Sequence, residues 1–402
     1  MTGEIHILLV IGSAIILSFF GGKLVNRFRL PMVTGYVIVG VILGRSFLNV
    51  ITPAIAERAS IFNDLALGII ALLIGGEFHR SRIRALGKTI VYIATFESLF
   101  AFLLVAGTVF LFTRKIYSAL ILGAVASATA PAATVAVINQ YRARGPLTTT
   151  IMGVVGSDDA IALMIYSFAS SVARSFLEHV KLTIHTILVV PITEITLSLL
   201  LGAVLGYLLG LGIKKTRNRA EAFTLVMGAL LIGEGIATQF HLSELLTIMA
   251  MGMMAVNIAP LRRFSQVMET VNIAGFPIIA AFFCLAGTKL NIRLLPQIGI
   301  LGLAYTAARM AGKWSGASLG AKISGASEKV RKYVGLSLFP QIGVAIALAI
   351  VVQKEFGGAG IQGQTLALLV INILLFTTII TEVVGPNLTR IILTKAGEIR
   401  KK

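Results

Sequence analysis

Residues 154–168 read VVGSDDAIALMIYSF, and two adjacent aspartates, Asp158 and Asp159, stand inside this otherwise apolar stretch. The flanking residues are apolar enough for a helix that crosses a membrane. An aspartate at the centre of a bilayer costs about 2.5–3.5 kcal/mol on insertion scales. Two carboxylates at this depth therefore indicate a functional site, because ionisable residues inside spans mark ion and proton pathways.

The composition of the whole chain is that of a polytopic membrane protein. Of its 402 residues, 56% are hydrophobic and 13% are charged, and the mean hydropathy is +0.92. Soluble domains contain about 25% charged residues. A hydrocarbon core needs helical stretches of roughly 20 apolar residues. The sequence predicts thirteen of them, at residues 5–22, 31–48, 61–76, 89–113, 117–139, 147–173, 183–213, 221–239, 243–258, 268–288, 294–320, 333–353 and 364–392.

The net charge of +18 follows the predicted topology. Loops on one side carry 24 basic residues: Lys23, Arg27, Arg29, Arg80, Arg82, Arg84, Lys88, Arg142, Arg144, Lys214, Lys215, Arg217, Arg219, Arg262, Arg263, Lys322, Lys329, Arg331, Lys332, Arg390, Lys395, Arg400, Lys401 and Lys402. Loops on the other side carry nine: Arg45, Arg58, Arg114, Lys115, Arg174, Lys181, Lys289, Arg293 and Lys354. The positive-inside rule places the N-terminus outside and the C-terminus in the cytoplasm. Nucleic-acid binding is not expected, because no soluble basic domain exists to carry it.

Cysteine usage and the N-terminus exclude other classes. Cys284 is the only cysteine, so no disulfide forms within the chain, and metal or haem cysteine motifs are absent. The first apolar run follows MTGEIH, which lacks the basic segment of a cleavable signal, so we expect it to stay as a helix. We expect no cofactor other than the transported ions.

Two predicted spans contain helix breakers at mid-depth. Residues 123–138 read GAVASATAPAATVAVI, with Thr129 and Ala130 before Pro131, and residues 335–350 read GLSLFPQIGVAIALAI, with Pro340, Gln341 and Gly343. Spans one to six and spans eight to thirteen form two six-helix halves, and each broken span is the fifth in its half. Corresponding spans are seven apart. Because seven is odd, they cross the membrane in opposite directions, so one half is inverted relative to the other. Broken helices at matched positions of inverted repeats point to the midplane site of a transporter.

The predicted organisation is therefore a single integral membrane transporter, residues 1–402. It comprises repeat one at 1–176, a linker helix at 177–216 and repeat two at 217–394. We expect no soluble regulatory domain.

The aspartate pair lies on the span directly after the first break, at the depth of Thr129. Neighbouring helix positions point about 100° apart, so we expect the two carboxylates to differ in role. Lys313 is the natural charge partner, because Arg309 and Lys313 are the only basic residues left inside spans. Carboxylates, hydroxyls and free carbonyls are hard ligands that suit a hard cation. The predicted ion- and proton-binding residues are Asp158, Asp159, Ser157 and Thr129.

Three other acidic residues lie inside predicted spans. Glu97 and Glu382 are interpreted as structural ion-pair partners, for example of Arg309, ahead of a direct transport role. Glu234 faces either a bundle interior or a subunit contact, and the sequence leaves that choice open.

These features make the chain similar to the cation:proton antiporters of the monovalent type 2 branch, the bacterial sodium/proton antiporters with an Asp-Asp pair. The resemblance covers the whole chain and rests on ATAPAATVAVI (128–138), GPLT (145–148), GSDDAIALM (156–164), ARMAGK (308–313) and PQIGVAIALA (340–349). It implies a homodimer in the bacterial inner membrane whose core domain moves like an elevator. By position, Asp159 would bind the cation, and Asp158 would pair with Lys313 and help to bind it. Two titrating carboxylates, or one carboxylate together with Lys313, would permit two protons per sodium ion and therefore electrogenic exchange.

The chain departs from some relatives at the breaks. Electroneutral relatives carry Asn-Asp in place of Asp158-Asp159 and Thr-Asp-Pro in place of Thr129-Ala130-Pro131. The missing carboxylate at Ala130 favours the type 2 branch and leaves the choice of ion open. Gln341 is uncharged where some relatives carry charge, so a pH-sensing role at this position is not supported.

Alternative functions remain. A potassium/proton exchanger of the same fold is compatible with the sequence, because ion size is read by ligand geometry. A sodium-coupled symporter of an organic anion would need a roomier polar cavity. A channel would need a continuous pore, and no enzyme motif occurs. Residues 75–88, GGEFHRSRIRALGK, are interpreted as an interfacial helix held by anionic lipid rather than as a pH sensor.

Overall fold

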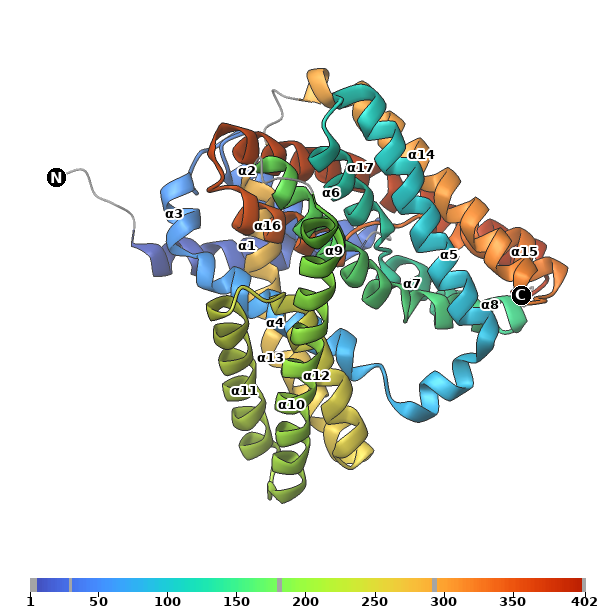
Figure 1. The fold of residues 1–402 in the computed structure, drawn as a ribbon, viewed down its shortest axis with the longest axis horizontal. Coiled ribbons are helices and arrows are strands. Elements are labelled where there is room, and N and C mark those ends of the chain that lie inside the picture. Colours follow the sequence, from blue (N-terminus) through green and yellow to red (C-terminus); the bar gives the residue numbers. More distant parts are fainter. Residues whose placement is uncertain (1–5, 29–30, 179–182, 291–294, 400–402) are drawn as a thin grey trace. The chain divides into compact units, whose positions relative to one another are not determined.

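The structure is a computed structural model that describes residues 6–28, 31–178, 183–290 and 295–399 (Figure 1). These ranges consist of helices and connecting segments and contain no strand, which confirms the predicted all-α class. Some residues used in the sequence predictions lie outside them, namely Ile5, Arg29, residues 179–182, Arg293, Leu294 and residues 400–402. The side chains of residues 82–86, in the predicted interfacial helix, are likewise not described.

The helices follow one another in the order of the predicted spans. The first part of the chain contains α1 (Ile7–Arg27), α2 (Met32–Leu43), α3 (Pro53–Arg58), α4 (Ser60–Gly76), α5 (Arg80–Thr113), α6 (Ile116–Ser127), α7 (Pro131–Gln140), α8 (Pro146–Val155) and α9 (Asp158–Leu177). The second part contains η1 (His185–Val189), α10 (Val190–Lys215), α11 (Arg219–Gln239), α12 (Glu244–Ile258), α13 (Leu261–Thr288), α14 (Leu295–Ile323), α15 (Glu328–Tyr333), η3 (Val334–Ser337), α16 (Val344–Phe356) and α17 (Gly360–Lys395).

Each of the thirteen predicted spans corresponds to helix in the described residues. Seven helical stretches there are long and apolar enough to cross a membrane: Ile7–Arg27, Gly87–Thr113, Pro146–Leu177, His185–Lys215, Arg219–Gln239, Leu261–Thr288 and Gly360–Ala396. Of the other six predicted spans, α2, α4 and α12 have between 12 and 17 residues. Two more, at 117–139 and 333–353, are broken in their middle. The sixth corresponds to α14, which carries the charged residues Arg309 and Lys313.

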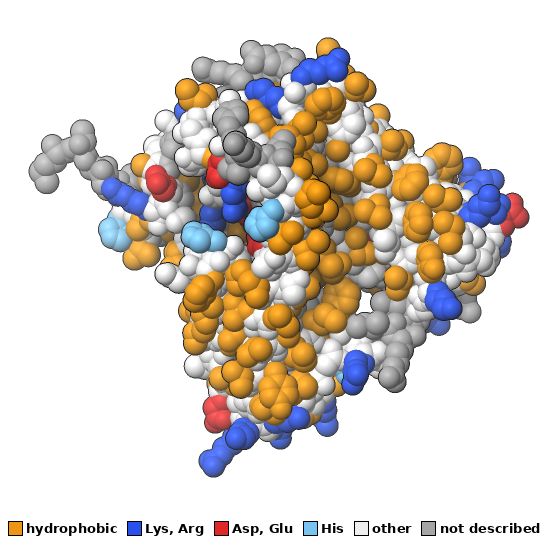
Figure 2. Space-filling model, in the orientation of Figure 1, with side chains coloured by type: hydrophobic (Ala, Val, Ile, Leu, Met, Phe, Trp, Pro, Cys, Tyr) orange, Lys and Arg blue, Asp and Glu red, His pale blue; other side chains and the backbone are white. Residues whose placement is uncertain are grey.

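Apolar side chains cover the sides of the helices, whereas Lys and Arg side chains gather at helix ends (Figure 2). Exposed large apolar residues occur along α1, α5, α10 and α11. In water such surfaces would be unfavourable, and in a bilayer they face lipid of the same polarity. The chain is therefore an integral membrane protein.

The helices form two compact units, each assembled from separate parts of the sequence. The first comprises residues 1–60, 88–162 and 280–402, and the second comprises residues 61–87 and 163–279. Helices α5, α9 and α13 each begin in one unit and end in the other. These units are defined by compact packing and not by internal repetition. The predicted division into two repeats and a linker helix therefore stays a prediction.

Within the second unit, α10 packs closely against α12 through small residues. A Cβ atom on Gly210 of α10 would lie 2.7 Å from Ile258 Cβ, and Gly202 and Gly206 face the backbone of α12 in the same way. Glycines spaced by four residues let two membrane helices approach closely. Glu234 of α11 also lies in this unit; it is 9% exposed and its carboxylate faces Gly68 of α4. Of the two alternatives for Glu234, the structure therefore supports the bundle interior.

Candidate functional site

The two broken spans meet at their breaks. The first span stops at Ser127, the end of α6, and resumes at Pro131, the start of α7. The second stops at Ser337, the end of η3, and resumes at Val344, the start of α16. The Ala130 N–H donates a hydrogen bond to the Pro340 carbonyl over 3.0 Å. The predicted crossing of two discontinuous helices is confirmed, and all parts of it lie in the first compact unit.

Local sequence explains where each break begins and ends. Pro131 occupies the first turn of α7, where its missing N–H leaves no hydrogen bond unmade. Gly343 precedes α16 with φ of +62°, a left-handed conformation that glycine adopts without steric cost. Pro340 interrupts the hydrogen bonding of the second span. Both breaks therefore result from residues that stand at the breaks themselves.

Arg309 of α14 binds the carbonyls that the breaks leave free. Its Nε donates to Ala126 O over 3.0 Å, and Nη2 donates to Ala128 O over 2.7 Å. On the second break, Nη1 donates to Phe339 O over 2.6 Å, and Nη2 also reaches Pro340 O at 3.4 Å. The guanidinium group is fully buried. Unpaired carbonyls at this depth would cost several kcal/mol each, so Arg309 makes the irregular backbone tolerable.

Neutral side chains complete this support. Gln341 Nε2 donates to Val125 O over 3.1 Å and lies 2.9 Å from the hydroxyl oxygen of Tyr305. Thr134 Oγ1 donates to Ser337 O over 2.8 Å, and Thr378 Oγ1 donates to Gln341 O over 2.8 Å. Gln341 is thus a structural tie between the two breaks.

The predicted span at 147–173 implied that the aspartate pair lies within one continuous helix. The structure instead divides this span into two helices directly before the pair. Helix α8 ends at Val155, a turn follows at Gly156 and Ser157, and α9 begins at Asp158. Both aspartates stand in the first turn of α9, where the helix dipole favours negative charge. Asp158 is fully buried and Asp159 is 6% exposed. Because the break at Gly156 places both aspartates at a helix N-terminus, it offsets part of the free-energy cost of burying two carboxylates.

Lys313 of α14 lies at the centre of the charged cluster. Its Nζ is 2.5 Å from Glu97 Oε2 and 3.7 Å from Asp158 Oδ2, and all three side chains are fully buried. The same ammonium donates to Thr129 Oγ1 over 2.8 Å and to the Ser127 carbonyl. Lys313 therefore joins the aspartate pair to the first break.

Glu97 is the residue that sequence reasoning assigned differently. Arg309, the expected partner of Glu97, is instead bound to backbone carbonyls, and Glu97 holds the ammonium of Lys313. Ser98 Oγ adds a hydrogen bond to Glu97 Oε1 over 2.9 Å. The reason lies in the packing of α5, which carries Glu97, against α14.

Helices α5 and α14 run side by side at close range (Figure 1). Gly312, Gly316 and Gly320 of α14 face the backbone of α5, and a Cβ atom on Gly312 or Gly320 would lie 2.6 Å from an α5 backbone atom. Small residues at every fourth position allow this approach. The signal was present in the sequence as GKWSGASLG, residues 312–320. The close packing brings Glu97 to Lys313.

The balance of charge in the cluster favours a cation. Asp158, Asp159 and Glu97 supply three carboxylates, and Lys313 and Arg309 supply two positive charges. With all five ionised, one negative charge remains. No hydrogen bond of the described residues reaches either oxygen of Asp158 or Asp159 Oδ1. These buried acceptors can coordinate a cation or accept protons.

Two predicted or suspected residues stand apart from this cluster. The Ser157 hydroxyl donates back to the carbonyls of Gly153 and Val154, so it stabilises the end of α8. Glu382 of α17 is 1% exposed, and neither carboxylate oxygen makes a hydrogen bond with described residues. Arg309, the partner suggested for Glu382 from the sequence, interacts with it electrostatically, but its guanidinium hydrogen bonds go to backbone carbonyls.

Comparison with known proteins gives a consistent result. A family model described as "Sodium/hydrogen exchanger, transmembrane" matches residues 14–390. The structure of the sodium proton antiporter MjNhaP1 from Methanocaldococcus jannaschii at pH 8 has a TM-score of 0.78 and 19% sequence identity, covering 97% of this chain and 98% of that one. An electron-microscopy structure of the same antiporter has a TM-score of 0.76 and 19% identity, covering 98% and 99%. No curated protein sequence matches the chain. At this identity the likeness establishes a shared fold.

Proposed function

Because the chain belongs to the sodium/hydrogen exchanger family, we propose that it exchanges protons for Na⁺, and also Li⁺, at the Asp158–Asp159 pair. The observation that carries this proposal is the pair of buried carboxylates beside two crossed helix breaks, with Lys313 held 2.5 Å from Glu97. Asp159 and Asp158 bind the cation, and Thr129 offers a hydroxyl oxygen. Ser157, assigned to the same group from the sequence, supports the turn before the pair.

The exchange is proposed to be electrogenic. Glu97 supplies the near counter-charge of Lys313, so neither aspartate has to neutralise the ammonium alone. Both aspartates are then free to take one proton each when the cation leaves. Two protons move against one monovalent cation, and one net charge crosses the membrane in each cycle. Competition for the same oxygens couples the two fluxes, because the pair titrates as a unit.

Alternating access is proposed to occur by an elevator movement. All residues of the cluster belong to one compact unit, which supports its movement as a body. A site whose net negative charge is balanced by a bound cation crosses a region of low dielectric at less cost than the empty, charged site. We further propose a homodimer in the bacterial inner membrane, with the N-terminus outside and the basic loops and C-terminus in the cytoplasm.

Transport in proteoliposomes tests this function. With an inside-acid pH gradient and a pH-sensitive dye, NaCl and LiCl should each move protons, and Asp159→Asn should abolish the response. Glu57→Gln changes an exposed carboxylate on α3 and serves as the matched control. An imposed membrane potential should drive proton movement in the presence of Na⁺ if the exchange is electrogenic. A rate independent of the potential would reject the two-proton stoichiometry.

The cation series separates the alternatives. A response to KCl alone would retain the site and assign potassium/proton exchange. No response to any of the three cations from a correctly folded protein would reject antiport and turn attention to sodium-coupled uptake of an organic anion.

A further inference from the structure

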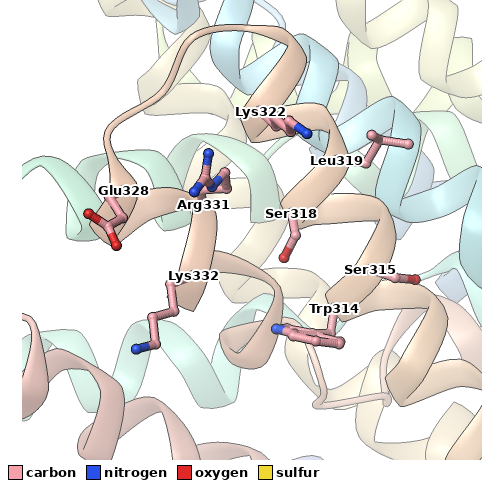
Figure 3. A pocket seen from close by; sticks show the side chains of 8 residues that line it. All are labelled: Trp314, Ser315, Ser318, Leu319, Lys322, Glu328, Arg331 and Lys332. Carbon is pink, nitrogen blue, oxygen red and sulfur yellow. The ribbon is translucent and has the colours of Figure 1, made fainter.

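A groove lies where the end of α14 meets α15, and its lining shares no residue with the charged cluster (Figure 3). It encloses about 560 Å³, and its lining includes Trp314, Ser318 and Lys322 of α14. From α15 come Glu328, Arg331 and Lys332. The groove thus combines an aromatic ring, a hydroxyl and three basic groups on two helices.

The positive charge of the groove is not neutralised by the protein. Lys322, Arg331 and Lys332 are exposed and make no ion pair within the described residues. Glu328 is the one acidic residue of the lining, so two positive charges remain. Lys332 also lies over the ring of Tyr333, 5.5 Å from its centroid. An anionic group would find complementary charge here.

The polarity of the groove changes along α14. Lys322 and Trp314 are eight positions apart, which corresponds to a rise of about 12 Å along the helix. Lys322 and Arg331 mark one end, Ser318 lies between, and the half-exposed Trp314 marks the other end, where Lys332 also lies (Figure 3). A basic end and an aromatic end match the phosphate and the acyl chain of a phospholipid. A soluble phosphate would use the basic end alone.

We propose that this groove binds an anionic phospholipid from the leaflet that faces the basic loops. Basic pockets between membrane helices recognise such headgroups. Arg331 from α15 and Lys322 from α14 hold the phosphate, Lys332 adds positive charge along the groove, and Trp314 packs against an acyl chain.

The bound lipid would brace a junction that supports the ion site. Trp314 directly follows Lys313 in the chain, and α15 continues through η3 to the break at Pro340. A Cβ atom on Gly335 of η3 would lie 2.7 Å from Trp314 Cα, so α14 and η3 are in close contact. A headgroup that bridges α14 and α15 therefore stabilises the contact between the helices that carry Lys313 and the second break.

Trp314 is the only tryptophan of the chain, so its fluorescence reports on this groove alone. The protein is reconstituted with phospholipids whose acyl chains carry bromine, which quenches tryptophan on contact. Brominated phosphatidylglycerol should quench Trp314 at least threefold more effectively than brominated phosphatidylcholine. In Arg331→Gln/Lys332→Gln the two lipids should quench alike. Quenching by the neutral lipid then shows that the variant is folded.

A matched control changes another exposed basic pair, Lys214→Gln/Lys215→Gln at the end of α10, and should keep the preference for the anionic lipid. Equal quenching by both lipids in the wild-type protein would overturn the proposal. Loss of the preference on addition of soluble glycerol phosphate would assign the groove to a free phosphate and also overturn it. The measurement is independent of transport, so its outcome does not depend on the proposed exchange.

Discussion

Lys313 Nζ lies 2.5 Å from Glu97 Oε2, inside the protein and with neither side chain exposed to solvent. The same ammonium is 3.7 Å from Asp158, so its shorter contact is to a carboxylate outside the aspartate pair. This arrangement leaves Asp158 and Asp159 available to a cation and to protons. We therefore propose that Glu97 is a positioning residue that acts through Lys313.

Replacing Glu97 by glutamine should weaken cation binding. Without its carboxylate, the Lys313 ammonium turns to Asp158 and competes with the cation for that oxygen. We expect the Na⁺ concentration for half-maximal exchange to rise at least tenfold, with a smaller change in maximal rate. Glu97→Asp should recover part of the affinity, and Glu57→Gln, which changes an exposed carboxylate on α3, is the control. An unchanged Na⁺ dependence in Glu97→Gln would show that Glu97 does not support Na⁺ binding through Lys313.

Replacing Arg309 by lysine should destabilise the crossing although the charge is kept. A lysine ammonium cannot reach carbonyls on both breaks in the planar geometry of a guanidinium group. Hydrogen bonds to charged groups contribute about 1.5–3 kcal/mol each, so we expect a marked loss of thermal stability in detergent together with loss of transport. The melting temperature of the purified protein checks this. A melting temperature equal to that of the wild type would contradict the structural role.

Adding a side chain at Gly316 should separate α5 from α14. Its Cβ atom would meet the α5 backbone at Glu97 Cα, 2.8 Å away. Overpacking of this kind costs about 1–3 kcal/mol, and it moves Glu97 away from Lys313. Gly316→Val should therefore lower stability and, like Glu97→Gln, raise the Na⁺ requirement. Gly107→Val on α5 is the control, because no neighbouring atom lies within 4 Å of the added Cβ.

Glu398 fastens the end of the chain to the start of α8. Its carboxylate accepts hydrogen bonds from the N–H groups of Leu147 and Thr148, at 2.8 and 2.7 Å, and from the Thr148 hydroxyl. Negative charge at a helix N-terminus is stabilising. Glu398→Gln should lower the free energy of unfolding by about 1–3 kcal/mol, with little effect on Na⁺ affinity. Hydrogen exchange should increase at the first turn of α8, and unchanged protection there would contradict this role.

The crossing of the two broken helices could be predicted from the sequence, because the residues that break each helix lie at the breaks themselves. Pro131, Pro340 and Gly343 impose their conformations on the backbone at the positions where they stand. The order of the spans likewise follows from hydropathy, and the family assignment agrees with the motifs at 128–138 and 156–164. The division of the superfamily into branches is not resolved by the family match, so the type 2 assignment stays a prediction.

The sequence predicted Asp158 as the partner of Lys313, and the two side chains lie 3.7 Å apart. The shorter contact between Lys313 and Glu97 was not predicted, because it depends on how two helices far apart in the sequence pack. Glu97 and Lys313 are 216 positions apart, and only the glycine face of α14 indicates which helix lies against it. Arg309 was likewise interpreted as a member of an ion pair. Every residue has a backbone carbonyl, so the sequence does not show which carbonyls a helix break leaves without a hydrogen bond. The turn at Gly156 was missed because a single glycine inside an apolar run is a weak signal.

Calorimetric titration of the purified protein with NaCl tests the central claim that Asp158 and Asp159 bind the cation in competition with protons. Repeating the titration in buffers of different ionisation enthalpy counts the protons released. We expect Na⁺ binding with proton release in the wild-type protein, weaker binding as the pH falls, and no binding in Asp159→Asn. Na⁺ binding by a folded Asp159→Asn variant with the affinity and proton release of the wild type would contradict it.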